Sequence, residues 1–155
     1  MRLFDFGLAK ELKHRDLVQP PDGYRATGVT GSRRYMAPEI VQSLPYGFRA
    51  DTYSFGILLW EMLSLRTPFC GYDSEKHYEQ VVVARHRPSL PRSWPLPVRT
   101  LLPRCWAPSS AERYTMEQVC NSLQTHLHTT CQANGKDDLH ISTRSCYLSS
   151  RQTSM

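Results

Sequence analysis

Residues 49–65 constrain the fold more than any other part of this 155-residue chain. The stretch has the length of a helix, and large apolar side chains occupy nearly every face of that helix, namely Tyr53, Phe55, Ile57, Leu58, Leu59, Trp60, Met62 and Leu63. A helix that is apolar all round is normally buried. We therefore expect this one to pass through the middle of the domain with other helices packed around it, which indicates a mainly helical fold.

Four further stretches predict helices, at residues 39–43, 74–85, 96–106 and 115–128. Ser74 is a possible N-cap of the second of these, with Glu75 in its first turn. Near the amino terminus, residues 2–12 predict two short strands around a turn. Residues 13–32, which include Pro20-Pro21-Asp22-Gly23, predict a long loop.

The chain changes composition at residue 129, after which Ser, Thr, Gln, Asn and Arg dominate and large apolar residues are few. Such a segment buries too little apolar surface to offset the entropy lost on ordering. We therefore predict one compact unit over residues 1–128 and a disordered tail over residues 129–155.

The composition excludes several function classes. The net charge is +5, but the basic residues are scattered, as in Arg33-Arg34 and Arg85-His86-Arg87, and accompany no nucleic-acid-binding motif. The five cysteines are an odd number without a CxxC pair, which favours neither a disulfide framework nor a zinc site. The most apolar run, residues 55–63, is too short to span a membrane and contains Glu61. A cytoplasmic, intracellular protein without a nucleic-acid partner or a membrane segment is expected.

Four segments occur in an informative order. Residues 3–10 read Leu-Phe-Asp-Phe-Gly-Leu-Ala-Lys, and residues 31–39 read Gly-Ser-Arg-Arg-Tyr-Met-Ala-Pro-Glu. Residues 51–61 read Asp-Thr-Tyr-Ser-Phe-Gly-Ile-Leu-Leu-Trp-Glu, and Arg-Cys-Trp at 104–106 leads to Arg113. Together they resemble the helical C-terminal lobe of a Ser/Thr protein kinase of the tyrosine-kinase-like group, starting at the Asp-Phe-Gly (DFG) motif.

The resemblance implies an activation segment at residues 5–39 and a helical subdomain at residues 40–128, together a partial kinase domain over residues 1–128. In the family the Gly-rich loop, the phosphate-pairing Lys and the catalytic-loop Asp and Asn all precede the DFG motif. They would require sequence ahead of Met1, so no catalytic residue is assigned. His14-Arg15-Asp16-Leu17 spells the start of the catalytic-loop motif, but it follows the DFG motif and is not interpreted as that loop.

The cofactors implied by the resemblance are ATP and Mg²⁺. Asp5 fills the position that holds Mg²⁺, Phe6 the position that packs beneath it, and Gly7 the position where the backbone turns. In this chain by itself Asp5 is instead interpreted as a solvated loop carboxylate, and tight binding of ATP or Mg²⁺ is not expected.

The resemblance also assigns roles in the activation segment. Thr27 and Thr30 match positions of activation-loop phosphorylation, although ordinary loop hydroxyls are an equal alternative. Ser32 matches the hydroxyl that contacts the catalytic Asp, and the absence of a tyrosine-kinase-type Pro in this segment favours Ser/Thr specificity.

Three residues have structural roles in the family. Glu39 and Arg113 match an ion pair that anchors the activation segment to the helical core, although Tyr114 stands where relatives usually carry Pro. Asp51 matches the residue that accepts hydrogen bonds from the catalytic loop, or alternatively caps the central helix.

Two functions follow as hypotheses. In the first, the chain is part of a kinase that transfers the γ-phosphoryl group of ATP to Ser/Thr hydroxyls of protein substrates and is inactive by itself. In the second, it is a non-catalytic protein-interaction module derived from a kinase lobe, which binds other proteins of kinase pathways.

Overall fold

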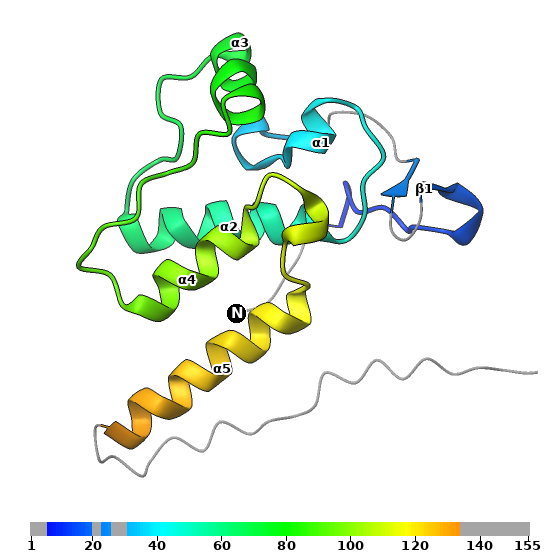
Figure 1. The fold of residues 1–155 in the computed structure, drawn as a ribbon. Helices are drawn as coiled ribbons and strands as arrows, with labels where there is room; N and C mark the ends of the chain where they lie inside the picture. Colours follow the sequence, from blue (N-terminus) through cyan, green and yellow to red (C-terminus); the bar gives the residue numbers. More distant parts are fainter. Residues whose placement is uncertain (1–5, 20–22, 26–30, 134–155) are drawn as a thin grey trace, which may run out of the picture.

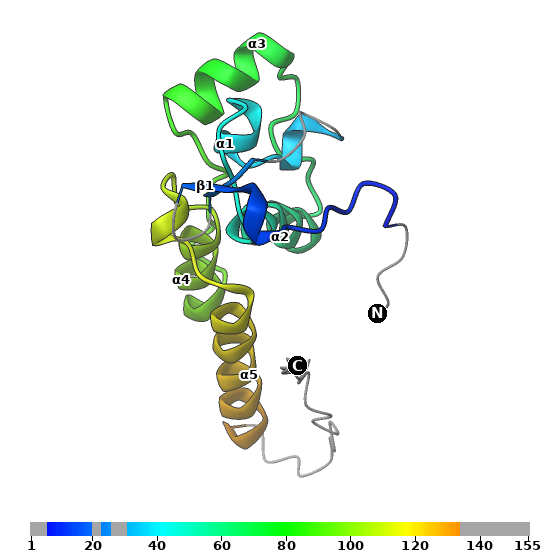
Figure 2. The same ribbon diagram turned by 90° about the vertical axis from the view of Figure 1, so that its right-hand side faces the viewer.

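The computed structural model describes residues 6–19, 23–25 and 31–133. Helix α2 (Arg49–Ser64) runs across the centre of Figure 1, with α1 (Pro38–Val41) and α3 (Ser74–His77) above it. Helices α4 (Leu96–Cys105) and α5 (Met116–Ala133) lie below it. Helix α4 packs between α2 and α5, and Figure 2 shows α5 extending away from the other helices. The predicted fold class, mainly helical, is confirmed.

Helix α2 has nearly the predicted bounds, and it ends because Leu65 adopts a left-handed conformation with φ of 54°. One side of the helix is buried, carrying Ala50, Thr52, Tyr53, Gly56, Ile57 and Trp60. The prediction of burial on every face is wrong, because Leu58, Met62 and Leu63 remain 40%, 50% and 45% exposed. The helices that cover α2 therefore pack against one side of it.

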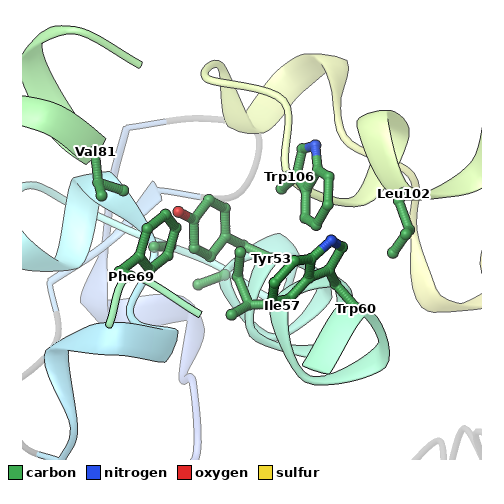
Figure 3. Packing of buried hydrophobic residues seen from close by; sticks show 9 residues of the cluster. Tyr53, Ile57, Trp60, Phe69, Val81, Leu102 and Trp106 are labelled. Carbon is green, nitrogen blue, oxygen red and sulfur yellow. The ribbon is translucent and has the colours of Figure 1, made fainter. Parts of the chain in front are cut away.

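The main hydrophobic core lies on the buried side of α2 (Figure 3). Tyr53, Ile57 and Trp60 of α2 meet Phe69 and Val81 on one flank, and Leu102 and Trp106 on the other. The Trp60 indole N–H donates to the Ser89 carbonyl at 2.9 Å, so this large ring is buried with its polar atom satisfied. The core thus joins the segments on both sides of α2.

The segment predicted as one helix over residues 74–85 divides into two. Helix α3 is followed by a single π-helical stretch, η3 (Tyr78–Val83), and Arg85 then adopts a positive φ of 57°. The N-cap is Asp73, whose Oδ1 accepts the Lys76 N–H at 2.8 Å, and Ser74 is the first helical residue. The predicted cap was wrong by one position.

Helix α5 begins with a reciprocal pair of caps. The Thr115 hydroxyl accepts the Gln118 N–H at 3.2 Å, and the Gln118 side chain accepts the Thr115 N–H at 2.8 Å. The helix continues to Ala133, beyond the predicted end at His128. The start of the predicted disordered tail is therefore helical, and the rest of that prediction, residues 134–155, lies outside the described residues.

The amino-terminal part differs from the prediction. The described residues 6–13 form a turn without a strand, and the part of the strand prediction at residues 2–5 lies outside the described residues. The strands lie instead in the predicted loop, where β1 (Leu17–Gln19) pairs antiparallel with β2 (Gly23–Tyr24) after the 3-10 turn η1 (His14–Asp16). Tyr24 and Tyr46 exchange two backbone hydrogen bonds of 3.0 and 3.2 Å. These bonds hold the hairpin against the segment before α2, and the local sequence does not reveal such a partner.

Gly56 lets α4 approach α2 closely. A Cβ atom at this position would lie 2.6 Å from the Cβ of Cys105. We expect Gly56→Ala to lower the free energy of unfolding by about 1–3 kcal/mol, because the two helices must move apart to admit the methyl group. Urea unfolding followed by circular dichroism measures the change. Met62→Ala, on the exposed side of the same helix, is the control, and an equal loss in both variants would contradict the close packing.

Among the cysteines with described side chains, Cys70 and Cys120 are exposed, Cys105 is buried, and all three are free thiols. Burial raises the pKa of the Cys105 thiol to about 12, so its reactive thiolate is scarce at neutral pH. We expect iodoacetamide to modify Cys70 and Cys120 in the folded chain, and Cys105 only after unfolding. Peptide mass mapping measures the modification. Labelling of folded Cys105 at the rate of Cys70 would contradict its burial.

No helix among the described residues is long and apolar enough to cross a membrane.

Candidate functional site

A cleft of about 540 Å³ lies where three parts of the chain meet. Its walls come from the amino-terminal segment, from the 3-10 turn η2 (Arg33–Tyr35) with its flanking residues and α1, and from the start of α2. The lining residues are Phe6, Leu8, Ala9, Lys10, Leu12, Ser32, Tyr35, Met36, Ile40, Tyr46, Gly47, Phe48, Asp51 and Ser54. The cleft therefore brings together three of the residues that the sequence singled out, Phe6, Ser32 and Asp51.

Asp51 lies in the first turn of α2 and faces this cleft. Burial raises the pKa of its carboxyl group, and burial together with the Asp51 charge raises the pKa of Tyr46. The helix N-cap is Phe48, so the expected capping role of Asp51 is wrong. Its negative charge still lies near the positive end of the α2 dipole, which is a favourable position.

The remaining predicted residues of the activation segment occupy different positions. Phe6 is 69% exposed, and Gly7, beside it in an exposed turn, is not among the residues that line the cleft. Ser32 immediately precedes η2 and makes no capping hydrogen bond with its side chain. Asp5, Thr27 and Thr30 lie outside the described residues, so their expected roles remain predictions.

Glu39 and Arg113 form a bidentate ion pair, with Nη1 to Oε1 at 2.5 Å and Nη2 to Oε2 at 2.7 Å. Arg113 is only 2% exposed, and its remaining N–H groups donate to the carbonyls of Ala107, Arg49 and Pro108 at 2.8, 3.3 and 3.2 Å. All five N–H donors of the guanidinium are thus satisfied. The pair ties α1, at the end of the predicted activation segment, to the loop between α4 and α5.

A second arginine, Arg87, takes part in the same core. The guanidinium carbons of Arg87 and Arg113 each lie 5.1 Å from the centre of the Tyr53 ring. Arg87 also donates to the carbonyls of Trp106 at 2.9 Å and Val81 at 2.9 Å. Burial lowers the pKa of Arg87 and raises that of Tyr53. In the sequence Arg87 is one of several scattered basic residues, because its local pattern does not reveal a buried aromatic partner.

Two contacts attach η2 to α2. The Tyr35 hydroxyl donates to Glu61 Oε2 at 2.7 Å, and the Ser54 hydroxyl donates to the Tyr35 carbonyl at 2.8 Å. The hydrogen bond to Glu61 is the main cause of the raised pKa of Tyr35. In the sequence Glu61 counts against a membrane span, and a carboxylate within an apolar run is also a signal that a polar partner is nearby.

The described residues do not by themselves fit a site for Mg²⁺ and ATP. Among the described residues, Asp51 is the only carboxylate and Lys10 the only cationic side chain that lines the cleft. No group of three His, Cys, Asp or Glu side chains in the described part of the chain is placed to hold a metal ion. The His14-Arg15-Asp16 turn does not line the cleft either. We therefore assign no nucleotide-binding step to these residues.

Residues 1–123 match the family model described as protein kinase domain. The chain is 34% identical over 128 residues to "Serine/threonine-protein kinase VIK" of Arabidopsis thaliana, covering 80% of this chain and 28% of the relative. It is 34% identical over 121 residues to "Dual specificity protein kinase shkB" of Dictyostelium discoideum, covering 77% and 18%. It is 30% identical over 130 residues to "Mitogen-activated protein kinase kinase kinase 7" of Homo sapiens, covering 82% and 19%. The chain thus spans less than a third of the length of these relatives.

Proposed function

This chain belongs to the protein kinase family, and we propose that residues 5–39 serve as the activation segment and residues 40–128 as the helical lobe that supports it. The kinase domain so formed is of the tyrosine-kinase-like group and transfers the γ-phosphoryl group of ATP to Ser/Thr hydroxyls of proteins. The 155 residues contain no catalytic-loop motif ahead of Asp5-Phe6-Gly7, so we propose that they do not catalyse this transfer by themselves.

The observation that carries the proposal is the Glu39–Arg113 pair. Its two side chains are 74 positions apart in sequence and meet with bidentate geometry at a buried site. A charge-assisted pair of this kind fixes geometry as well as adding energy. Because Glu39 follows Ser32 by only a few residues, the pair supports a role in holding the segment that faces a substrate hydroxyl.

The remaining roles follow from position. Ser32 lines the cleft and is proposed to contact the catalytic Asp of the complete domain. Asp51, whose carboxylate faces the same cleft, is proposed to accept hydrogen bonds from the catalytic loop. Asp5 is proposed to hold Mg²⁺, and Thr27 and Thr30 to be positions of activation-loop phosphorylation. The predicted cytoplasmic location belongs to the same proposal.

Sequencing of full-length transcripts that contain the Met1 codon tests the kinase proposal. We expect reads that continue upstream in the same frame into a Gly-rich loop, a Lys-bearing strand and an H-R-D catalytic loop. Transcripts that carry an in-frame stop codon immediately upstream of Met1 would contradict the proposal and favour a short non-catalytic protein.

The alternative, a non-catalytic interaction module, is favoured by the apolar side chains of Leu58, Met62 and Leu63 that α2 leaves exposed. It requires that the chain be stable by itself. Size-exclusion chromatography and urea unfolding of the 155-residue chain, followed by circular dichroism, test this requirement. A monodisperse helical protein with a cooperative unfolding transition supports the alternative, whereas an aggregated product without such a transition contradicts it.

A further inference from the structure

A second pocket, of about 310 Å³, lies between η2 and α3. One wall consists of Ser32, Arg33 and Arg34, and the other walls are formed by Phe69, Tyr72, Asp73, Ser74 and His77. Ser32 lines both this pocket and the candidate cleft. A molecule seated in the pocket therefore lies beside the hydroxyl to which the proposed kinase function assigns a substrate contact.

His77 is the unusual member of the wall. The residue is only 4% exposed, yet neither ring nitrogen has a hydrogen-bond partner among the described residues. Its ring packs edge-on against Phe69, with centroids 5.5 Å apart. A neutral imidazole carries one N–H donor and one acceptor, and leaving both unmatched in a buried position is unfavourable. A ligand in the pocket can supply the missing acceptor for the N–H.

The charges around the pocket are mostly positive. No carboxylate of the described residues forms an ion pair with Arg33 or Arg34. Of the described residues in the wall, Asp73 is the only acidic one, and its Oδ1 already accepts the Lys76 N–H. Burial and the charges of Arg33, Arg87 and Arg34 lower the pKa of His77, so the pocket presents two cations and a neutral imidazole against the single carboxylate of Asp73.

We propose that this pocket binds an anionic side chain of a polypeptide, either a carboxylate or a phosphoryl group, through Arg33, Arg34 and the His77 N–H. Arginine recognises both groups by paired, charge-assisted hydrogen bonds. The apolar rings of Phe69 and Tyr72 suit the rest of a peptide better than a free inorganic ion. A role of this pocket in selecting substrates rests on the proposed kinase function. The binding of an anionic peptide to the pocket does not depend on that function.

The test is a titration of the 155-residue chain, without nucleotide, by three peptides that differ at one position only. That position holds Ala, Glu or phosphoserine, and inorganic phosphate is a fourth ligand. The NMR signals of the His77 ring report on the pocket. We expect the Glu and phosphoserine peptides to bind at least about tenfold more tightly than the Ala peptide.

Variants locate the effect. Arg33→Ala combined with Arg34→Ala is expected to abolish the preference for anionic peptides, whereas Arg92→Ala, an exposed arginine outside the pocket, leaves it unchanged. Asp73→Asn keeps a good helix cap but removes the negative charge, so it is expected to tighten the binding of both anionic peptides. Unfolding midpoints show that each variant is folded. His77→Phe is a second test of the pocket, because it removes the ring N–H donor and retains an aromatic ring against Phe69.

Three outcomes would overturn the inference. The first is equal affinity for the Ala, Glu and phosphoserine peptides. The second is an anion preference that survives both the arginine replacements and His77→Phe. The third is binding of inorganic phosphate as tightly as of either anionic peptide, which would identify a site for a free anion. None of these outcomes depends on the transcript sequencing that tests the kinase proposal. The peptide-binding inference and the kinase proposal can therefore fail separately.

Discussion

Replacing Arg113 by Met is expected to lower the free energy of unfolding by about 3–5 kcal/mol. The change leaves Glu39, whose side chain is only 13% exposed, without its partner, and removes the donors to the carbonyls of Ala107, Arg49 and Pro108. Arg113→Lys is expected to recover only part of the loss, because one ammonium group cannot reproduce five N–H donors in a planar fork. Urea unfolding followed by circular dichroism measures both variants.

The control for this prediction is Arg92→Met, which removes the same charge from an exposed position. It is expected to change stability by no more than about 0.5 kcal/mol. If Arg113→Met lowers the free energy of unfolding by less than about 1 kcal/mol, the pair behaves like an exposed ion pair, and its role as a buried anchor is contradicted.

The 155-residue chain is expected to transfer almost no phosphate from Mg-ATP to a Ser/Thr peptide. The absence of a general base alone removes about 10²- to 10⁴-fold in rate. Phosphoryl transfer also depends on groups that position the phosphates, and the cleft has only Lys10 as a cationic lining residue among the described residues. Incorporation of radiolabelled phosphate into the peptide measures the rate.

Asp5→Asn is the matched control for this assay. If the variant shows the same residual phosphate transfer as the unchanged chain, that transfer comes from a contaminating kinase. An active kinase in parallel shows that the peptide and nucleotide are competent. Turnover of about 1 per second or more by the 155 residues, abolished by Asp5→Asn, would contradict the proposal that they are inactive by themselves.

Long and strongly patterned features were predictable from the sequence. The bounds of α2 followed from an uninterrupted apolar helix-length stretch. Helix α4 was located by the proline that follows it, Pro108, and α5 by apolar residues at helical spacing. The meeting of Glu39 with Arg113 came from the family resemblance, because no local rule connects two residues so far apart in sequence.

Features set by tertiary contacts were missed. The hairpin β1–β2 is held in place by backbone pairing of Tyr24 with Tyr46, and no pattern within residues 13–32 indicates that partner. The exposed side of α2 was missed because an apolar pattern shows that a face favours burial but not which element covers it. The second pocket was missed for a similar reason, since Arg33 and His77 converge only after α3 packs against η2.

A double-mutant cycle between Glu39 and Arg113 tests most directly whether the proposed activation segment is anchored to the proposed helical lobe. Glu39→Met, Arg113→Met and the double variant are compared by urea unfolding. The account predicts a coupling energy of about 2–3 kcal/mol or more, with the double variant no less stable than the Arg113 variant, because its Glu39 carboxylate is no longer left unpaired. Losses that simply add, with coupling near zero, would show that the pair does not hold the two parts together and would contradict the account.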